Sequence, residues 1–167
     1  MSLQVELQDL YNGFTKKVPP EVLTLMLDTT RRLVDSGIAE KSLKVGEKAP
    51  DFNLPNPSGE SVNLQSLLEK GPVVLNFYRG GWCPYCNLEL NAYQRRLQDI
   101  EGLGATLVAI SPETPDNSLS TSEKNDLKFP VLSDQGNQTA NKFGLVFQLP
   151  SELHELYLEF QPTGNRK

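Results

Sequence analysis

The sequence predicts an α/β fold with a mostly parallel central sheet, preceded by a helical N-terminal extension. From residue 43 onward, short strand-like apolar segments alternate with helix-like segments, a pattern typical of βαβ units. The segment 105–110 is almost continuously apolar, as strands in the middle of a parallel sheet are. Before residue 43 the apolar residues follow a helical period instead. We therefore divide the chain into an extension, residues 1–42, and a main domain, residues 43–167.

The extension is predicted to contain two helices. The first has an apolar stripe at helical spacing, formed by Leu3, Leu7, Leu10 and Phe14. Pro20 suits the first turn of the second helix, whose end is marked by Gly37. We interpret the two helices as a hairpin packed on the main domain. The alternative is a dimerisation arm of a homodimer, because such an apolar stripe also fits a partner helix.

The main domain is predicted to begin with a small hairpin and to continue with alternating strands and helices. The hairpin strands flank a turn rich in proline and glycine, residues 55–59. The expected hairpin strands are residues 52–54 and 61–64, and the expected further strands are residues 73–78, 105–110 and 129–132. Helices are expected at residues 83–101, over a polar stretch that ends near residue 125, and at residues 137–143 and 151–160.

Composition and charge exclude several classes of function. The chain has 167 residues, a formal net charge of −5 and scattered basic residues, so nothing indicates binding to nucleic acid or to an anionic membrane. No apolar run approaches the ~20 residues of a membrane-spanning helix, and the N-terminus lacks the apolar region of a signal peptide. Two cysteines are too few for a disulfide scaffold, which favours a reducing, cytoplasmic location.

The most informative motif is a pair of cysteines three positions apart. Cys83 and Cys86 lie in the segment YRGGWCPYC, residues 78–86, where a strand-like run gives way to a helix-like one. The start of a helix stabilises a thiolate through its unpaired N–H groups, and the pKa of a cysteine there falls to about 3.5–7.5. We therefore predict that Cys83 is an exposed nucleophile. Cys86, one turn later on the same helix face, is expected to be more buried and to resolve the oxidised form of Cys83.

Six neighbouring residues are predicted to support this dithiol. Arg79 is the nearest cation in the sequence and stabilises the thiolate or positions an oxyanion; the alternative is a solvated surface charge. Gly80 and Gly81 let the loop turn sharply and bring its backbone close to a substrate. The remaining neighbours shield the sulfur, pack, or begin the helix, and these are Trp82, Pro84 and Tyr85.

The cysteine pair has two plainer interpretations. The first is half of a zinc site, but zinc needs four ligands and the chain has two cysteines and one histidine, His154. We therefore expect no metal and no other cofactor, and we assign His154 no functional role. The second interpretation is a pair of buried, inert thiols.

Four segments of the chain occur in an order that identifies a family. They are residues 44–64, which begin KVGEKAPDFNL, residues 74–86 with the dithiol, residues 110–114 (ISPET) and residues 129–134 (FPVLSD). Together they resemble the alkyl hydroperoxide reductase C/thiol-specific antioxidant (AhpC/TSA) superfamily, and within it a peroxiredoxin-like branch with a Cys-Pro-Tyr-Cys dithiol. This resemblance covers residues 43–160 and implies a thioredoxin-like fold with redox chemistry at Cys83 and Cys86.

The sequence departs from that family at two places. Typical peroxiredoxins place a Thr or Ser three residues before the peroxide-reactive cysteine and a Pro four residues earlier, where this chain has Gly80 and Asn76. The hydroxyl group that would orient a peroxide is therefore absent. Thioredoxin-like folds also end with a β-hairpin and a helix, and residues 160–167 show no such pattern. We expect either that the chain is truncated before this C-terminal part or that something else completes the edge of the sheet.

Three functions are consistent with these residues. The first, which we favour, is a peroxidase: Cys83 reduces a hydroperoxide to become a sulfenic acid, Cys86 closes a disulfide, and an external thiol such as thioredoxin or glutathione reduces it. The second is a thioredoxin- or glutaredoxin-like reductase that acts on a substrate disulfide. The third is a non-catalytic thioredoxin-like domain whose incomplete sheet binds a partner.

Overall fold

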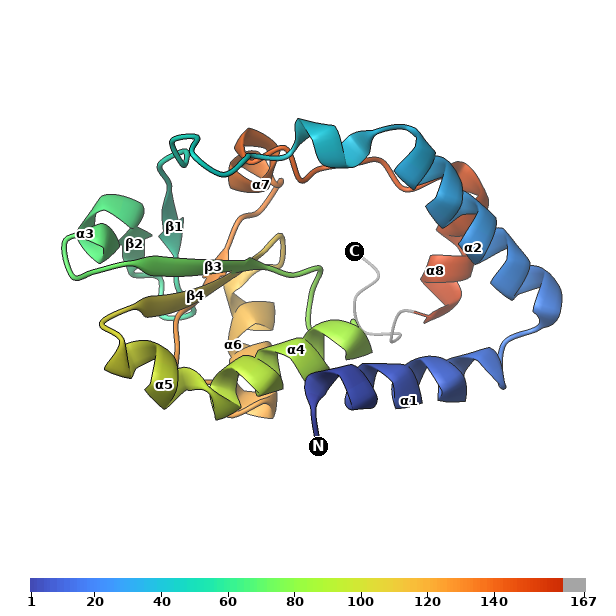
Figure 1. The fold of residues 1–167 in the computed structure, drawn as a ribbon, viewed down its shortest axis with the longest axis horizontal. Helices are drawn as coiled ribbons and strands as arrows, with labels where there is room; N and C mark the ends of the chain where they lie inside the picture. Colours follow the sequence, from blue (N-terminus) through green and yellow to red (C-terminus); the bar gives the residue numbers. More distant parts are fainter. Residues whose placement is uncertain (161–167) are drawn as a thin grey trace.

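The centre of the molecule is a parallel sheet of three strands (Figure 1). The computed structural model describes residues 1–160. Within them, β3 (Val73–Phe77), β4 (Thr106–Ser111) and β5 (Val131–Ser133) pair in the order β3-β4-β5, so that β4 is central. Both pairings are parallel, which confirms the mostly parallel sheet predicted from the sequence.

A separate antiparallel pair precedes this sheet, and helices occupy much of the remaining chain. Strands β1 (Asn53–Pro55) and β2 (Ser61–Asn63) form the hairpin that the sequence predicts. The helices, in chain order, are α1 (Leu3–Thr15), α2 (Pro20–Asp35), the 3-10 helix η1 (Ile38–Lys41), α3 (Leu64–Leu68), α4 (Pro84–Arg95), α5 (Leu97–Gly102), α6 (Pro115–Lys124), α7 (Gln138–Lys142), the 3-10 helix η2 (Ser151–Leu153) and α8 (His154–Phe160).

Alternating side chains of β4 contribute to two apolar layers, one on each face of the sheet. Leu107 packs with Leu90 of α4 and Leu97 of α5 in one layer. Val108 and Ile110 pack in the other layer with apolar residues of the β1–β2 hairpin and of α3. Because both faces of β4 are covered, its sequence is apolar without alternation.

The carboxyl ends of the parallel strands meet at one edge of the sheet, where ligands bind in many α/β folds. The chain leaves β3 at Phe77 and passes through residues 78–82 before α4 begins at Pro84. Residues 112–114, which follow β4, lie at the same edge. The topology therefore brings the dithiol loop beside a segment that is distant in sequence.

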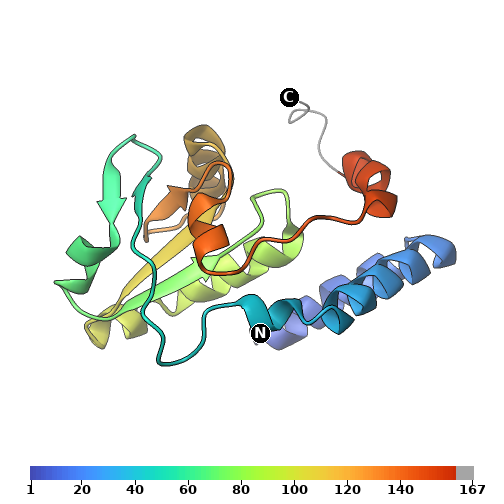
Figure 2. The same cartoon turned by 90° about the horizontal axis from the view of Figure 1, so that it is seen from above.

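Helices α1 and α2, together with η1, form an arc beside the main domain, which we call the N-terminal arm (Figures 1 and 2). Helix α1 packs along α4, and Arg95 forms an ion pair with Glu6 at 2.8 Å. Past η1, the Leu43 N–H donates to the Phe143 carbonyl oxygen at 3.1 Å. The arm is thus attached to the main domain at both ends. The domain boundary after residue 42 and the dimerisation role stay predictions.

The structure bears on two further expectations, the long helix after the dithiol and the missing C-terminal hairpin. The single helix predicted at 83–101 is wrong, because Arg96, with φ −107° and ψ 5°, separates α4 from α5. Between residues 134 and 160 the structure contains no further strand. The expected absence of a closing hairpin also concerns residues 161–167, which lie outside the described residues. Among residues 1–160, no helix is long and apolar enough to span a lipid bilayer.

Candidate redox site

Cys83 is the N-cap residue of α4, so its sulfur lies at the unpaired N–H groups of the first helical turn. Its backbone is extended, with φ −85° and ψ 112°, and the Cys86 N–H donates to Cys83 Sγ at 3.4 Å. Pro84, the first helical residue, has no N–H that would need a partner. A negative charge on this sulfur is stabilised by the N–H groups and by the helix dipole.

The relative burial of the two cysteines is the reverse of the prediction. Cys83 is 2% exposed, whereas Cys86 is half-buried, and both are free thiols. The prediction considered the helix alone, in which the first residue is the more open one. In the folded chain, the side chains of Arg79, Trp82 and Tyr157 gather beside Cys83 and reduce its exposure.

The environment lowers the pKa of the Cys83 thiol to about 5. The largest cause is the hydrogen bond from the Cys86 thiol, and the Cys86 N–H and the Arg79 guanidinium act in the same direction, against the effect of burial. The same thiol–thiolate bond raises the pKa of Cys86, which therefore keeps its proton. At neutral pH the pair consists of one thiolate and one thiol. This combination supplies both a nucleophile and a group that can displace the product from it.

The Arg79 guanidinium lies beside the Cys83 sulfur and also beside two aromatic rings. Its Nη2 lies 3.6 Å from Cys83 Sγ, and its guanidinium carbon lies 4.9 Å from the ring centroid of Trp82 and 5.8 Å from that of Tyr157. The two rings meet edge to face, with centroids 6.5 Å apart. Burial lowers the pKa of Arg79, but hydrogen bonds to Tyr157 and Cys83 outweigh it and raise this pKa. Arg79 is therefore a permanent cation beside the thiolate, although part of its side chain is solvated.

Gly80 and Gly81 are required by close contacts of the loop. Gly80 has φ 149°, and a Cβ atom at this position would lie 2.5 Å from Trp82 Nε1. A Cβ atom at Gly81 would collide with the hydroxyl of Thr121. A threonine at position 80, as in typical peroxiredoxins, therefore does not fit this loop.

Two residues that the sequence analysis missed hold Gly81 in place. The Gly81 N–H donates to Glu113 Oε2 at 2.9 Å, and Asn87 Nδ2 donates to the Gly81 carbonyl oxygen at 2.8 Å. Asn125 Nδ2 of the segment after α6 donates in turn to Asn87 Oδ1 at 2.9 Å. Glu113 follows β4 at the sheet edge where the dithiol loop follows β3, so the predicted parallel topology is the signal that could have identified it.

A cavity of about 880 Å³ lies against the two cysteines, and we call it the thiol cavity. Cys83, Cys86 and Arg79 line one side of it. The other side is formed largely by the N-terminal arm, through Tyr11, Phe14, Lys17, Val18, Leu23, Met26, Leu27 and Thr30. The apolar stripes of the two N-terminal helices could be read from the sequence, but their position beside the cysteines, and that of Tyr157, could not, because it arises from tertiary packing.

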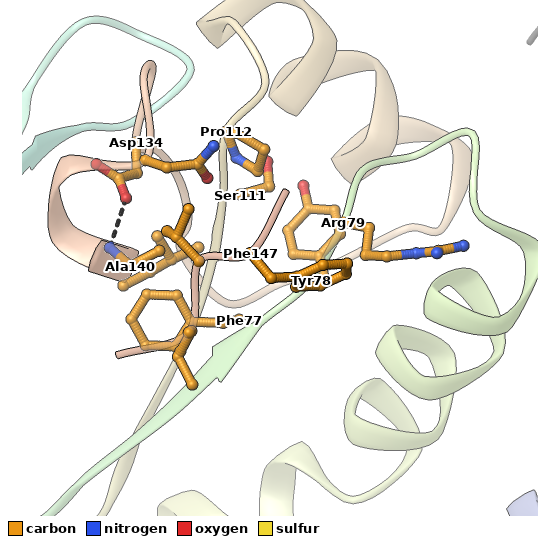
Figure 3. Close-up of a pocket in the computed structure, with 12 residues that line it drawn as sticks. Phe77, Tyr78, Arg79, Ser111, Pro112, Asp134, Ala140 and Phe147 are labelled. Atoms are coloured by element: carbon orange, nitrogen blue, oxygen red, sulfur yellow. Dashed lines mark hydrogen bonds between the residues drawn. The ribbon is translucent and has the colours of Figure 1, made fainter. Parts of the chain in front are cut away.

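A second cavity, of about 320 Å³, lies at the carboxyl ends of the strands and contains neither cysteine (Figure 3). Figure 3 shows the Arg79 side chain pointing away from Ser111 and Asp134, toward α4. Asp134 is 2% exposed, and its carboxylate accepts the N–H groups of Thr139 and Ala140 at 3.0 and 2.8 Å. Its role is thus to cap α7.

The predicted site residues form one continuous segment, residues 79–86, and this segment contributes Arg79, Trp82 and residues 83–86 to the thiol cavity. His154 lies outside that lining, and its Nε2 is 2.9 Å from the Leu149 carbonyl oxygen. Within residues 1–160, no three His, Cys, Asp or Glu side chains gather as a metal site would require.

Comparisons with known proteins found relatives of two kinds. The model of the AhpC/TSA family matches residues 45–162. Peroxiredoxin Bcp of Escherichia coli (strain K12) is 31% identical over 103 residues, which cover 62% of this chain and 65% of that protein. Thiol-disulfide oxidoreductase ResA of Bacillus thuringiensis is 29% identical over 108 residues, covering 64% and 61%. The chain therefore spans less than two thirds of the length of either relative.

A solved structure resembles this chain as well. The crystal structure of peroxidoxin BcpB from Mycobacterium tuberculosis superposes with a TM-score of 0.62 at 30% sequence identity. The superposition covers 65% of this chain and 70% of that one. The thioredoxin-like fold expected from the sequence is thereby confirmed.

Proposed function

This chain belongs to the AhpC/TSA family, and on that premise we propose that it is a thiol-dependent peroxidase in which Cys83 reduces hydroperoxides. One observation supports this most directly: the Cys83 sulfur lies at the start of α4 and accepts hydrogen bonds from Cys86 and Arg79. A sulfur in this environment is an anion at neutral pH, and the thiolate is the form that attacks a peroxide.

The reaction proceeds in two steps within the protein. In the first, the Cys83 thiolate attacks the terminal oxygen of R–OOH; the O–O bond breaks, an S–O bond forms, and RO⁻ takes up a proton and leaves as the alcohol. Cys83 is now a sulfenic acid. In the second step, the sulfur of Cys86 attacks that of Cys83, and the sulfenic oxygen leaves as water with the Cys86 proton. Residues at i and i+3 share a helix face, so the disulfide closes locally.

Arg79 and the loop are assigned supporting roles. The Arg79 guanidinium stabilises the thiolate and lies where it can donate to the leaving oxygen. Gly80 and Gly81 keep the loop close to Glu113, while Trp82, Pro84 and Tyr85 line the space that a substrate enters. The proposed catalytic residues are Cys83 and Cys86.

An external thiol completes the cycle. Reduction of the Cys83–Cys86 disulfide takes two electrons and two protons, which a dithiol protein of the thioredoxin class or two glutathione molecules supply. Such reductants are kept reduced in the cytoplasm, and a chain with two cysteines needs no oxidising compartment to fold. We therefore propose a cytoplasmic location.

A second candidate function is protein disulfide reduction. It is favoured by the similarity to ResA, a thiol-disulfide oxidoreductase, and by the partly exposed Cys86 beside a thiolate. In this reaction Cys83 attacks a substrate disulfide, and Cys86 then attacks the mixed disulfide and releases the reduced product.

The two functions are separated by intact-mass measurements on the reduced protein after mixing with hydrogen peroxide. We expect the wild type to lose two hydrogen atoms, Cys86→Ser to gain one oxygen atom, and Cys83→Ser to remain unchanged. Peroxide oxidation of Cys83→Ser at the wild-type rate would contradict the assignment. Rapid reduction of insulin without oxidation by peroxide would favour the reductase, and unreactive thiols would leave a non-catalytic domain.

A further inference from the structure

One wall of the thiol cavity comes from residues that lie outside the segment matched by the family. Tyr11 of α1 and Leu23, Met26 and Leu27 of α2 face the cavity, whereas the family match begins at residue 45. Tyr11 is 39% exposed and Leu27 is 49% exposed, although both present large apolar surfaces. Exposed apolar residues gathered in a cavity indicate a binding site.

Two cations line this cavity, and its one anionic group is the Cys83 thiolate. Arg79 and Lys17 line it, and no Asp or Glu is found among its described lining residues. This contrasts with the chain as a whole, whose formal net charge is −5. Arg79 lies beside the reactive sulfur, while Lys17 lies between α1 and α2 and forms no ion pair within residues 1–160.

We propose that the N-terminal arm builds a binding site for an anionic amphiphile, whose apolar chain lies against α1 and α2 and whose carboxylate pairs with Lys17. The ligand class is a long-chain aliphatic carboxylate. When such a chain carries a hydroperoxide group, the arm holds that group at Cys83. The reaction of the ligand rests on the proposed peroxidase function, but its binding does not.

The shape of the cavity favours a small molecule over a protein partner. Its volume of about 880 Å³ falls within the range of roughly 300–1,000 Å³ that is usual for small-molecule sites. It lies between the arm and the dithiol helix, and both sides contribute aromatic or aliphatic groups. An apolar chain with one negative end fits both the apolar walls and Lys17, the lining cation that is not paired with the Cys83 thiolate.

Binding is tested with a redox-inert probe, dodecanoate, read by tryptophan fluorescence. Trp82 is the single tryptophan of the chain and lines the cavity, so its emission reports on occupancy. We expect saturable quenching by dodecanoate, and a weaker effect of its methyl ester, which lacks the charge. Binding by Lys17→Glu is expected to be weaker by about two- to fivefold, as loss of an ion pair at an exposed side chain implies.

Two matched controls exclude general effects of charge and of helix mutation. Lys16→Glu changes the same charge at an exposed neighbour that does not line the cavity, and we expect unchanged binding. Leu27→Glu introduces a charge into the wall, whereas Val34→Glu introduces it at a position of α2 that is 67% exposed and does not line the cavity. Weakening by Leu27→Glu alone supports the proposal. Because all four side chains are exposed, the variants are expected to fold.

Peroxidase turnover provides the second measurement. We expect kcat/KM for a long-chain fatty-acid hydroperoxide to fall in Lys17→Glu by a larger factor than kcat/KM for tert-butyl hydroperoxide, and both values to stay at the wild-type level in Lys16→Glu. The inference is overturned if dodecanoate does not bind, or if Lys17→Glu and Lys16→Glu bind dodecanoate equally well. It is also overturned if sedimentation shows a dimer to which dodecanoate does not bind. Absence of turnover with every hydroperoxide would instead refute the peroxidase function, while the fluorescence result would still decide on the binding site.

Discussion

At the scale of single residues, the reactivity of Cys83 is set by three donors around one sulfur. The Cys86 thiol and N–H approach it from the helix, and Arg79 approaches from the preceding loop. The position of Cys83 at a helix start could be predicted from the sequence, because a strand-like run, a Cys-Pro pair and a helix-like run follow one another. Its burial could not, since Tyr157 lies far along the chain and packs beside Arg79.

The pH dependence of alkylation tests this account of the thiolate. We expect the rate of Cys83 modification by iodoacetamide, followed by peptide mass mapping, to rise with pH around a midpoint of about 5. Arg79→Met keeps the length of the side chain but removes its charge, and should raise this midpoint by about one pH unit. Arg31→Met, an exposed change on α2, is the control. A midpoint near that of a free cysteine in the wild type would contradict the proposed stabilisation.

At the scale of elements, the dithiol loop is fixed by groups from two different parts of the fold. Glu113 after β4 accepts the Gly81 N–H, and Asn87 of α4 donates to the Gly81 carbonyl oxygen. The strands and the hairpin could be predicted from apolar runs and turn residues. The break at Arg96 could not, because the apolar spacing continues through it from α4 into α5.

Removal of the Glu113 carboxylate should loosen this loop. In Glu113→Ala the partly buried Gly81 N–H loses its acceptor, which we expect to lower the free energy of unfolding by about 1–3 kcal/mol. The peroxide oxidation of Cys83 should slow at the same time, and Glu113→Gln, which retains an acceptor oxygen, should restore most of both properties. Urea unfolding and stopped-flow oxidation measure these effects. Glu123→Ala, at an exposed position of α6, should change neither.

At the scale of the whole molecule, the main domain follows from its sequence more directly than the N-terminal arm does. The core of the sheet can be predicted from apolar runs such as Leu107 to Ile110, whose side chains are buried on both faces of the sheet. The stripe on α1 and the apolar face of α2 specify helices, but many partners could cover such surfaces. The placement of α1 and α2 around a cavity is therefore known from the tertiary structure and not from the sequence.

The stability of the reduced protein should depend on pH through Cys83. The pKa of this thiol is about 5 in the folded state and about 8.5 in an unfolded chain, so between these values the unfolded state binds more protons. Stability from this group is fully present above the unfolded pKa and is lost as the pH falls through about 5. The difference in unfolding free energy between wild type and Cys83→Ser should therefore rise with pH by up to about 1.4 kcal/mol per unit. Urea titrations under reducing conditions at several pH values measure it, and a flat difference would refute the lowered pKa.

The double attachment of the N-terminal arm has a consequence for which oxidants can reach the sulfur. Helix α1 is fastened along α4, and the far end of the arm is fastened by the backbone bond between Leu43 and Phe143. A segment held at both ends moves less than a segment held at one end only. Because the arm is held at both ends, we expect the cavity beside Cys83 to admit small oxidants more readily than bulky ones.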